Sequence, residues 1–323
     1  MLAADGVLAA HWDDRGIETV RTGGIQVVMV VEVGRGRLLC SEVLKFCRPH
    51  VSNLVSCNSI HQYEQKLPDV TPHDGGDDHV WLKILEEAKS DMEQEPILSK
   101  YYFSSVFLHN SLETALANHL AIKLSNSNIT SDTLYGVFLS VLSEDVEIKR
   151  AIRDDLRAVK ERDPACISFV HCFLNFKGFL ACQAHRVAHK LWSQGRIAVA
   201  LLIQNRVSEV FAVDIHPAAK IGWGILLDHA TGVVIGETAV IGNDVSILHN
   251  VTLGGTGKVS GDRHPKIGDG VLIGAGTKVL GNIKIGEGAK IGAASVVLKE
   301  VPPKATAVGN PARMVRGNDR PKL

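Results

Sequence analysis

Two different spacings of hydrophobic residues divide the chain into two main parts. Between residues 77 and 208, leucines stand four residues apart at Leu112, Leu116, Leu120 and Leu124. Such a spacing places the side chains on one face of a helix, so this part predicts an all-α domain. Further helices are predicted over 144–161, 176–192 and 196–210.

The predicted helices also carry end signals. Asn110 followed three residues later by Glu113 resembles a capping box at the start of the leucine repeat. Gly195 separates the last two helical stretches and is a suitable stop. Apolar faces that such a domain leaves uncovered would serve packing or oligomerisation.

Beyond residue 209 the spacing of aliphatic residues becomes six. Unbroken examples are Ile267, Ile273, Val279, Ile285, Ile291 and Val297. An earlier series keeps the same spacing through Ile215, Ile221, Leu227 and Val233. The phase then slips by two residues before Ile235, Ile241, Ile247 and Leu253 resume it.

A period of six has a direct structural meaning. Each hexapeptide forms one face of a triangular coil, its aliphatic side chain fills the axis, and three hexapeptides close a coil of roughly 18 residues. An ordinary β-strand has period two and does not explain the pattern. The fold class is therefore predicted as α+β, with a helical domain (77–208) followed by a left-handed parallel β-helix (209–313).

Residues 254–266, G-G-T-G-K-V-S-G-D-R-H-P-K, interrupt this period. They are predicted to leave the β-helix as a loop before Ile267 re-enters it. Loops that leave a rigid repeat commonly carry function, so this loop is a candidate part of a site.

The two ends of the chain are less patterned. Residues 1–76 are interpreted as a poorly ordered extension that could serve targeting, and residues 314–323 as a C-terminal tail. Transit peptides avoid acidic residues, and this segment contains Asp13, Asp14, Glu18, Glu32 and Glu42. A cytoplasmic location is therefore expected, with a plastid or mitochondrion as the alternative.

Composition excludes several classes of protein. Lys+Arg and Asp+Glu are equal at 35 each among 323 residues, which gives no basic footprint for nucleic acid or an acidic membrane surface. The longest apolar run, residues 25–33, is too short to span a bilayer. None of the six cysteines forms a C-x-x-C pair, so neither a disulfide scaffold nor a thiolate zinc site is expected.

Asp214 and His229 are the candidate catalytic pair. They lie fifteen positions apart, a little under one predicted coil, so they can occupy neighbouring coils. A carboxylate beside an imidazole fixes its tautomer and stabilises its protonated form. The pattern alone leaves a second interpretation open, in which the aspartate shapes a turn and the histidine is structural.

Several motifs resemble the serine acetyltransferase family. They are D-I-H-P-A-A-K-I-G, L-L-D-H-A-T-G, S-I-L-H-N-V-T-L-G-G-T-G-K, G-D-R-H-P-K-I-G-D-G and G-N-P-A-R, together with K-E-R-D-P-A and L-W-S-Q-G-R in the helical part. The similarity covers about residues 79–315 in both domains and is greatest to the plant enzymes. It implies transfer of an acetyl group from acetyl-CoA to the hydroxyl of L-serine.

The resemblance also implies residue roles. His229 would be the general base, oriented by Asp214, and Asp163 and Asp228 would hold the substrate ammonium. Arg263 and His264, on the loop, would bind the substrate carboxylate. The implied contacts to CoA are Gly255, Thr256 and Ala275.

Partners follow from the same resemblance. Acetyl-CoA would be a co-substrate, with no permanently bound cofactor and no metal, and cysteine would be a feedback inhibitor that competes for the serine pocket. The implied assembly is a homotrimer, paired into a hexamer, with each site between subunits. The family's C-terminal tail, which ends in isoleucine and docks into O-acetylserine sulfhydrylase, has no counterpart at Pro321, Lys322 and Leu323, which argues against that partner.

Three other functions are weighed. A zinc hydratase on the same β-helix would use His229, His249 and His264 as ligands. A non-catalytic scaffold derived from a transferase would show no turnover. A related acyltransferase would act on a sugar or on homoserine; Asp163 and the D-R-H-P loop favour serine over these.

Overall fold

The computed structural model describes residues 11–12, 17–22, 25–30, 78–257 and 260–315. Within the predicted N-terminal extension, three short strands form an antiparallel sheet in the order β1-β2-β3. They are β1 (His11–Trp12), β2 (Ile17–Thr22) and β3 (Ile25–Val30). Hydrophobic spacing did not predict this sheet, in which Ile17 pairs with Val30 and Thr22 with Ile25. The rest of that extension and the tail beyond Val315 lie outside the described residues.

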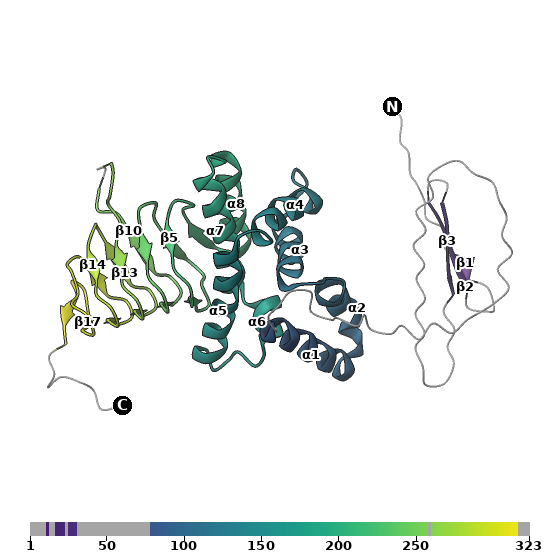
Figure 1. Cartoon of the computed structure of the whole chain (residues 1–323), viewed down its shortest axis with the longest axis horizontal. Coiled ribbons are helices and arrows are strands. Elements are labelled where there is room, and N and C mark those ends of the chain that lie inside the picture. Colours follow the sequence, from purple (N-terminus) through teal and green to yellow (C-terminus); the bar gives the residue numbers. More distant parts are fainter. Residues whose placement is uncertain (1–10, 13–16, 23–24, 31–77, 258–259, 316–323) are drawn as a thin grey trace. The chain divides into compact units, whose positions relative to one another are not determined.

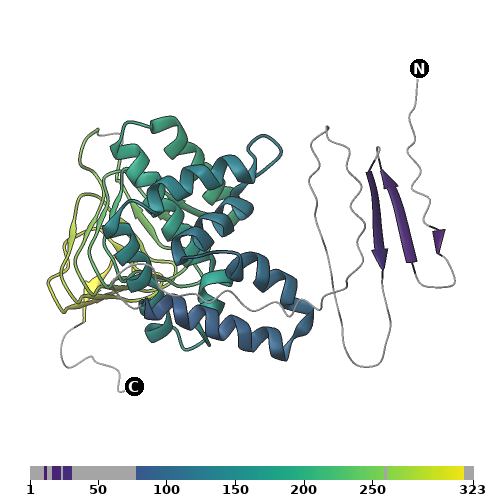
Figure 2. The same cartoon turned by 45° about the vertical axis from the view of Figure 1, so that its right-hand side comes forward.

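Helices fill the next part of the chain, as the leucine spacing predicts. They are α1 (His79–Gln94), η1 (Pro96–Leu98), α2 (Ser99–Tyr102), the π-helical η2 (Phe103–Phe107), α3 (Leu112–Leu124), α4 (Ser131–Leu142), α5 (Val146–Arg162), α6 (Phe169–Asn175), α7 (Lys177–Ser193) and α8 (Ile197–Phe211). Gly195, at φ 77°, separates α7 from α8, as expected. Helices α5, α7 and α8 lie against the β-helix, and α1 to α4 lie on the side away from it (Figures 1 and 2). None of the helices in the described part of the chain could cross a membrane.

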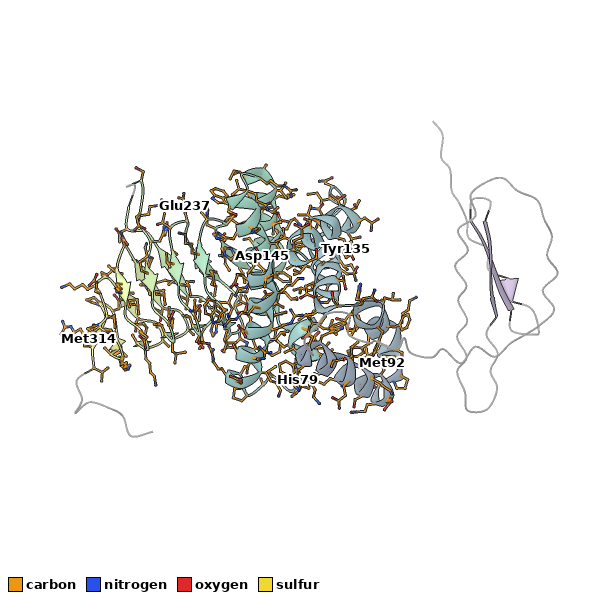
Figure 3. The ribbon with its side chains drawn as sticks, in the orientation of Figure 1. His79, Met92, Tyr135, Asp145, Glu237 and Met314 are labelled. Atoms are coloured by element: carbon orange, nitrogen blue, oxygen red, sulfur yellow. The ribbon has the colours of Figure 1, made fainter. Side chains whose placement is uncertain are left out.

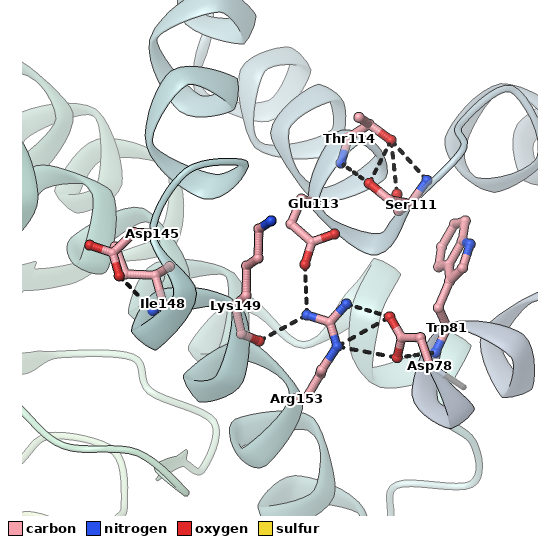
Figure 4. A network of polar contacts seen from close by, with 9 residues as sticks. All are labelled: Asp78, Trp81, Ser111, Glu113, Thr114, Asp145, Ile148, Lys149 and Arg153. Carbon is pink, nitrogen blue, oxygen red and sulfur yellow. Dashed lines mark hydrogen bonds and ion pairs between the residues drawn. The ribbon is translucent and has the colours of Figure 1, made fainter. Parts of the chain in front are cut away.

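The start of α3 corrects one prediction. The N-cap is Ser111, whose hydroxyl accepts from the Thr114 N–H, and Thr114 closes the capping box in place of the predicted Asn110 and Glu113 (Figure 4). Glu113 is buried and accepts from the Arg153 guanidinium at 2.6 Å. A buried carboxylate needs such a partner, so Glu113 is not free to cap the helix.

The β-helix consists of three parallel sheets, one per face. The first face holds β4 (Val213–Ile215), β7 (Val233–Ile235), β10 (Thr252–Gly254), β13 (Lys278–Leu280) and β16 (Val296–Val297). The second holds β5 (Lys220–Ile221), β8 (Val240–Ile241), β11 (Lys266–Ile267) and β14 (Lys284–Ile285). The third holds β6 (Leu226–Leu227), β9 (Ser246–Ile247), β12 (Leu272–Ile273), β15 (Lys290–Ile291), β17 (Thr306–Val308) and the antiparallel β18 (Arg313–Met314).

The aliphatic residues at period six form the core of this β-helix. All of the predicted positions are buried except Ile221, which packs partly buried against the same core. The 254–266 break also appears as predicted, since the chain leaves after β10 and returns at β11. The three cysteines in the described part, Cys166, Cys172 and Cys182, are buried and unbridged.

The phase slip in the sequence marks a longer first coil. Ile215 pairs with Ile235, a coil of 20 residues, whereas Ile235 pairs with Leu253, a coil of 18. The backbone register identifies the two additional residues as His229 and Ala230, because the N–H groups on either side keep regular partners in the neighbouring coil. The slip therefore inserts His229 into a corner of the β-helix.

A buried ion pair joins the helical domain to the first coil. Asp155 on α5 accepts from Arg186 on α7 at 2.7 Å and from the Ile225 N–H at 2.8 Å. Arg186 also donates to the Gly222 carbonyl at 2.7 Å. Because Asp155, Arg186 and Ile225 are buried and their polar groups are hydrogen-bonded to one another, this contact fixes α5 and α7 on the end of the β-helix.

Gly178, in the first turn of α7, allows that close approach. A Cβ at this position would lie 2.0 Å from the Leu227 carbonyl oxygen, on the strand that leads into Asp228. We expect Gly178→Ala to lower the free energy of unfolding by about 1–3 kcal/mol, because the clash outweighs the helix-propensity gain of about 1 kcal/mol. Urea denaturation measures this.

Gly136, on α4, is the matched control. A Cβ there meets nothing within 4 Å, so Gly136→Ala should raise the free energy of unfolding by up to about 1 kcal/mol. A Gly178→Ala variant as stable as Gly136→Ala would show that the α7 contact with β6 is not tight.

Candidate active site

The predicted site residues gather mainly at two corners of the triangular coil. The Asp228 corner connects the third face to the first and comprises residues 228–232, 248–251 and 274–277. The Arg263 corner connects the first face to the second and comprises residues 216–219, 236–239, 255–257 and 260–265. The strands of the first face, β4, β7 and β10 among them, run between these corners.

His229 is the most accessible candidate at the Asp228 corner. Its side chain is 75% exposed, and its Nε2 lies 3.8 Å from Asp228 Oδ1. The ring packs edge-on against His249, with 5.7 Å between centroids. An exposed imidazole beside a carboxylate is suited to accept a proton from a bound molecule.

The turn that presents His229 is unusual for the residues it contains. His229 and Ala230 have φ values of 53° and 58°, in the left-handed region that costs non-glycine residues about 1–2 kcal/mol each. Thr231 stabilises this turn through two hydrogen bonds. Its carbonyl accepts from the Asn250 N–H at 2.7 Å, and its hydroxyl accepts from Lys177 of α7. Both domains therefore hold the conformation of this turn.

Asp214 lies on β4, and its Oδ1 accepts from Gln204 of α8 at 2.7 Å. The carboxylate that lies within ion-pair distance of His229 is that of Asp228, whereas Asp214 is bound to Gln204. The orientation of His229 by Asp214 therefore stays a prediction.

Asp163 follows the last residue of α5. Its Oδ1 accepts from the Ala165 N–H at 2.8 Å, which forms a tight turn. The preceding residue, Arg162, contacts Ser246 on β9, and Ser246 pairs with Leu226 of β6. Since β6 leads directly into Asp228, the helical domain brings Asp163 to the strand pair that ends at the Asp228 corner.

At the Arg263 corner, the returning loop is fastened to the β-helix. Arg263 Nη2 donates to Glu237 Oε2 at 2.5 Å, and this hydrogen bond lowers the pKa of the Glu237 carboxyl. Glu237 lies at the loop-bearing edge of the β-helix in Figure 3. The backbone N–H groups of Arg263 and His264 both donate to Thr238 Oγ1. The loop end is therefore held in one position.

His264 is buried in this corner with a defined tautomer. The Thr238 N–H donates to His264 Nδ1 at 3.1 Å, so the ring proton lies on Nε2. Burial lowers the pKa of His264, which favours the neutral ring. Gly236 makes room for it, since a Cβ there would lie 2.0 Å from His264 Nε2. A neutral ring fixed in this way can donate one hydrogen bond from Nε2 to an anion.

The predicted CoA contacts also lie at both corners. Gly255 and Thr256 begin the loop at the Arg263 corner, whereas Ala275 lies at the Asp228 corner. Within one chain, His229 and Arg263 thus occupy different corners of the coil.

Four residues that support the site were not predicted from the sequence: Lys177, Gln204, Glu237 and Thr238. Lys177, Glu237 and Thr238 act through contacts with residues 25 to 54 positions away, and Gln204 acts across the junction between α8 and β4. The G-E-T corner after β7 does precede the loop by one coil, but nothing in the period indicates which side chains meet.

The three histidines of the alternative zinc site lie at two different corners of the β-helix. His229 and His249 lie at the Asp228 corner, and His264 lies at the Arg263 corner. No group of three or more His, Cys, Asp or Glu side chains in the described ranges could hold a metal ion.

Comparison with known proteins supports the motif resemblance. A family model described as "Serine acetyltransferase, N-terminal" matches residues 80–184, and the bacterial transferase hexapeptide model matches residues 264–299. Over 246 residues the chain is 72% identical to "Serine acetyltransferase 1, chloroplastic" of Arabidopsis thaliana, covering 76% of this chain and 78% of that protein.

The chain belongs to the serine acetyltransferase family. A second Arabidopsis thaliana member, "Serine acetyltransferase 3, mitochondrial", is 70% identical over 245 residues, which cover 76% of this chain and 63% of that protein. The family assignment agrees with the combination of a helical domain and a β-helix described above.

Solved serine acetyltransferases share this fold. The soybean enzyme complexed with serine matches with a TM-score of 0.72 and 65% identity, covering 73% of this chain and 97% of that one. The Brucella abortus enzyme in complex with coenzyme A has a TM-score of 0.72 and 48% identity, covering 73% and 94%. A serine acetyltransferase in complex with cysteine has a TM-score of 0.72 and 51% identity, covering 73% and 98%.

Proposed function

We propose that this serine acetyltransferase moves the acetyl group of acetyl-CoA to L-serine. The products are O-acetyl-L-serine and CoA, and the reaction begins cysteine biosynthesis from serine. The observation that carries the proposal is the accessible His229, inserted into the β-helix beside Asp228 in a chain of this family. The related structures bound to serine and to coenzyme A support both substrates.

The reaction is a direct transfer with His229 as general base. The imidazole takes the proton of the serine hydroxyl while the hydroxyl oxygen attacks the thioester carbonyl. The tetrahedral intermediate collapses, the C–S bond breaks, and the imidazolium returns the proton to the sulfur of CoA. Asp228, and Asp214 if it turns from Gln204, would stabilise the imidazolium.

Serine is a zwitterion, so its site needs charges of both signs. Asp163 and Asp228 would bind the ammonium group. Arg263 and His264 would bind the carboxylate, with the guanidinium and the Nε2–H as donors.

The two ends of serine would be held by different subunits. Within one chain the carboxylates near His229 and the donors of the loop occupy different corners, which supports a site between protomers of a homotrimer. We also propose that two trimers pair through their helical domains into a hexamer.

CoA would bind along Gly255, Thr256 and Ala275, where small side chains let the pantetheine arm approach the backbone. Cysteine, which differs from serine by a thiol in place of the hydroxyl, would compete for the same pocket. The related structure with cysteine bound supports this inhibition. The organelle names of the two Arabidopsis relatives favour a plastid or mitochondrial location over the cytoplasmic one expected first.

CoA release from acetyl-CoA tests the proposal, with L-serine, L-homoserine or no acceptor added. We expect release to depend on L-serine and to be about 10–200-fold slower with L-homoserine, since the additional methylene displaces the hydroxyl from His229. Equal rates with homoserine would favour the related acyltransferase. A folded oligomer that releases no CoA with any acceptor would favour the scaffold.

A further inference from the structure

Arg162 connects the helical domain to the β-helix next to the proposed serine site. It is the last residue of α5, and its guanidinium reaches the second coil. Nη1 donates to the Asp244 carbonyl at 3.0 Å and to Ser246 Oγ at 3.3 Å, and Nη2 donates to Asp244 Oδ1 at 2.9 Å. One side chain thus binds both a corner and the strand that follows it.

The residue after Arg162 is Asp163, and the turn around Asp163 is rigid. The Cys166 N–H donates to the Asp163 carbonyl at 3.0 Å, and the Ala165 N–H donates to Asp163 Oδ1 at 2.8 Å. Within the described part of the chain, no hydrogen bond involves Oδ2, the second carboxylate oxygen of Asp163. A rigid turn moves as a unit, so the anchor at Arg162 sets where that oxygen lies.

Ser246, which Arg162 contacts, pairs with the strand that leads to Asp228. Ser246 pairs with Leu226 of β6, and β6 ends one residue before Asp228. Arg162 therefore fixes the position of the Asp163 turn relative to the strand that carries Asp228. These are the two carboxylates assigned to the substrate ammonium.

The same contact contributes little to folding stability. The Arg162 and Asp244 side chains are 27% and 62% exposed, and ion pairs this exposed have little effect on stability. The buried pair of Asp155 and Arg186 already holds α5 and α7 on the first coil. Loss of Arg162 should therefore displace Asp163 without detaching the helical domain.

We propose that Arg162 is a positioning residue for serine, which holds Asp163 at the correct distance from Asp228. This inference rests on the proposed function. It predicts an effect on serine binding that is separate from acetyl-CoA binding, because the Asp163 turn is not among the CoA contacts.

The experiment compares the KM values of the full-length enzyme and its variants for both substrates. We expect Arg162→Met to raise the KM for L-serine about tenfold, with the KM for acetyl-CoA unchanged within about twofold. Arg162→Lys should be intermediate, since it keeps one charged donor but loses the forked geometry. Asp244→Asn should raise the KM for L-serine by less than Arg162→Met does. Asparagine suits this position because it tolerates the φ of 58° there.

Arg157→Met is the matched control. Arg157 lies on the same helix, and its ion pair with Asp154 stays within that helix. We expect its KM values to match the wild type. The inference is overturned if Arg162→Met leaves the serine KM within twofold of wild type, if both KM values rise equally, or if Arg157→Met has the same effect. If Arg162→Met does not fold, Asp244→Asn decides by the same criterion. A wild-type enzyme that shows no serine-dependent turnover would instead contradict the proposed function.

Discussion

Replacing His229 by asparagine is expected to lower serine-dependent CoA release by about 10²-fold or more. The serine hydroxyl is a weak nucleophile, and general-base catalysis typically contributes about 10²–10⁴-fold. Asparagine is chosen because it tolerates left-handed φ values, so the turn at φ 53° should persist without the imidazole. Steady-state CoA release at saturating substrates measures the effect on kcat.

Ala230→Gly serves as the control for this experiment. It changes the neighbouring residue at φ 58° to one that adopts this conformation freely, and leaves the imidazole in place. Its kcat should stay within a few fold of wild type. A His229→Asn enzyme that keeps more than a tenth of wild-type kcat would rule out His229 as the base.

Activity is expected to return when two inactive variants share an oligomer. His229→Asn and Arg263→Met should each lose at least about 10²-fold in serine-dependent turnover when alone. In the proposed homotrimer, assembled from an equal mixture, a site is intact when an Arg263→Met chain supplies its His229 and a His229→Asn chain supplies its Arg263. With equal random mixing, that holds for about a quarter of the sites, so about a quarter of wild-type activity should reappear.

A mixture of His229→Asn with Asp228→Asn is the matched control. Both substitutions affect the same corner of one chain, so no combination of these subunits contains an intact corner, and activity should stay at its residual level. If the His229→Asn and Arg263→Met mixture also stays there, the site does not combine the Asp228 corner of one chain with the Arg263 corner of another.

The sequence predicted the fold well where one physical requirement repeats. Ile267, Ile273 and Val279 recur because each hexapeptide must supply one aliphatic side chain to the axis, and each is buried as expected. The helices were predictable for the same reason, because apolar side chains must recur on the buried face of each helix. The β1–β3 sheet was missed because it is a single short unit without such a repeat.

The candidate site was only partly predictable for the same reason. The phase slip before Ile235 was visible in the sequence, but only the coil register shows that it inserts His229 and Ala230. The contacts of Gln204 with Asp214 and of Arg263 with Glu237 join residues whose meeting depends on how domains and coils stack. The start of α3 was mispredicted for the same reason: Glu113 binds Arg153, a residue on another helix, and Ser111 caps α3.

The most direct test of acetyl transfer to serine is the product balance of a single reaction. O-acetyl-L-serine and CoA would be quantified together by mass spectrometry, along with the mass of the protein during turnover. We expect one molecule of O-acetyl-L-serine for each CoA released, and a protein mass that never gains an acetyl group. CoA release without O-acetyl-L-serine, or an acetylated protein that forms before product, would contradict direct transfer from acetyl-CoA to serine.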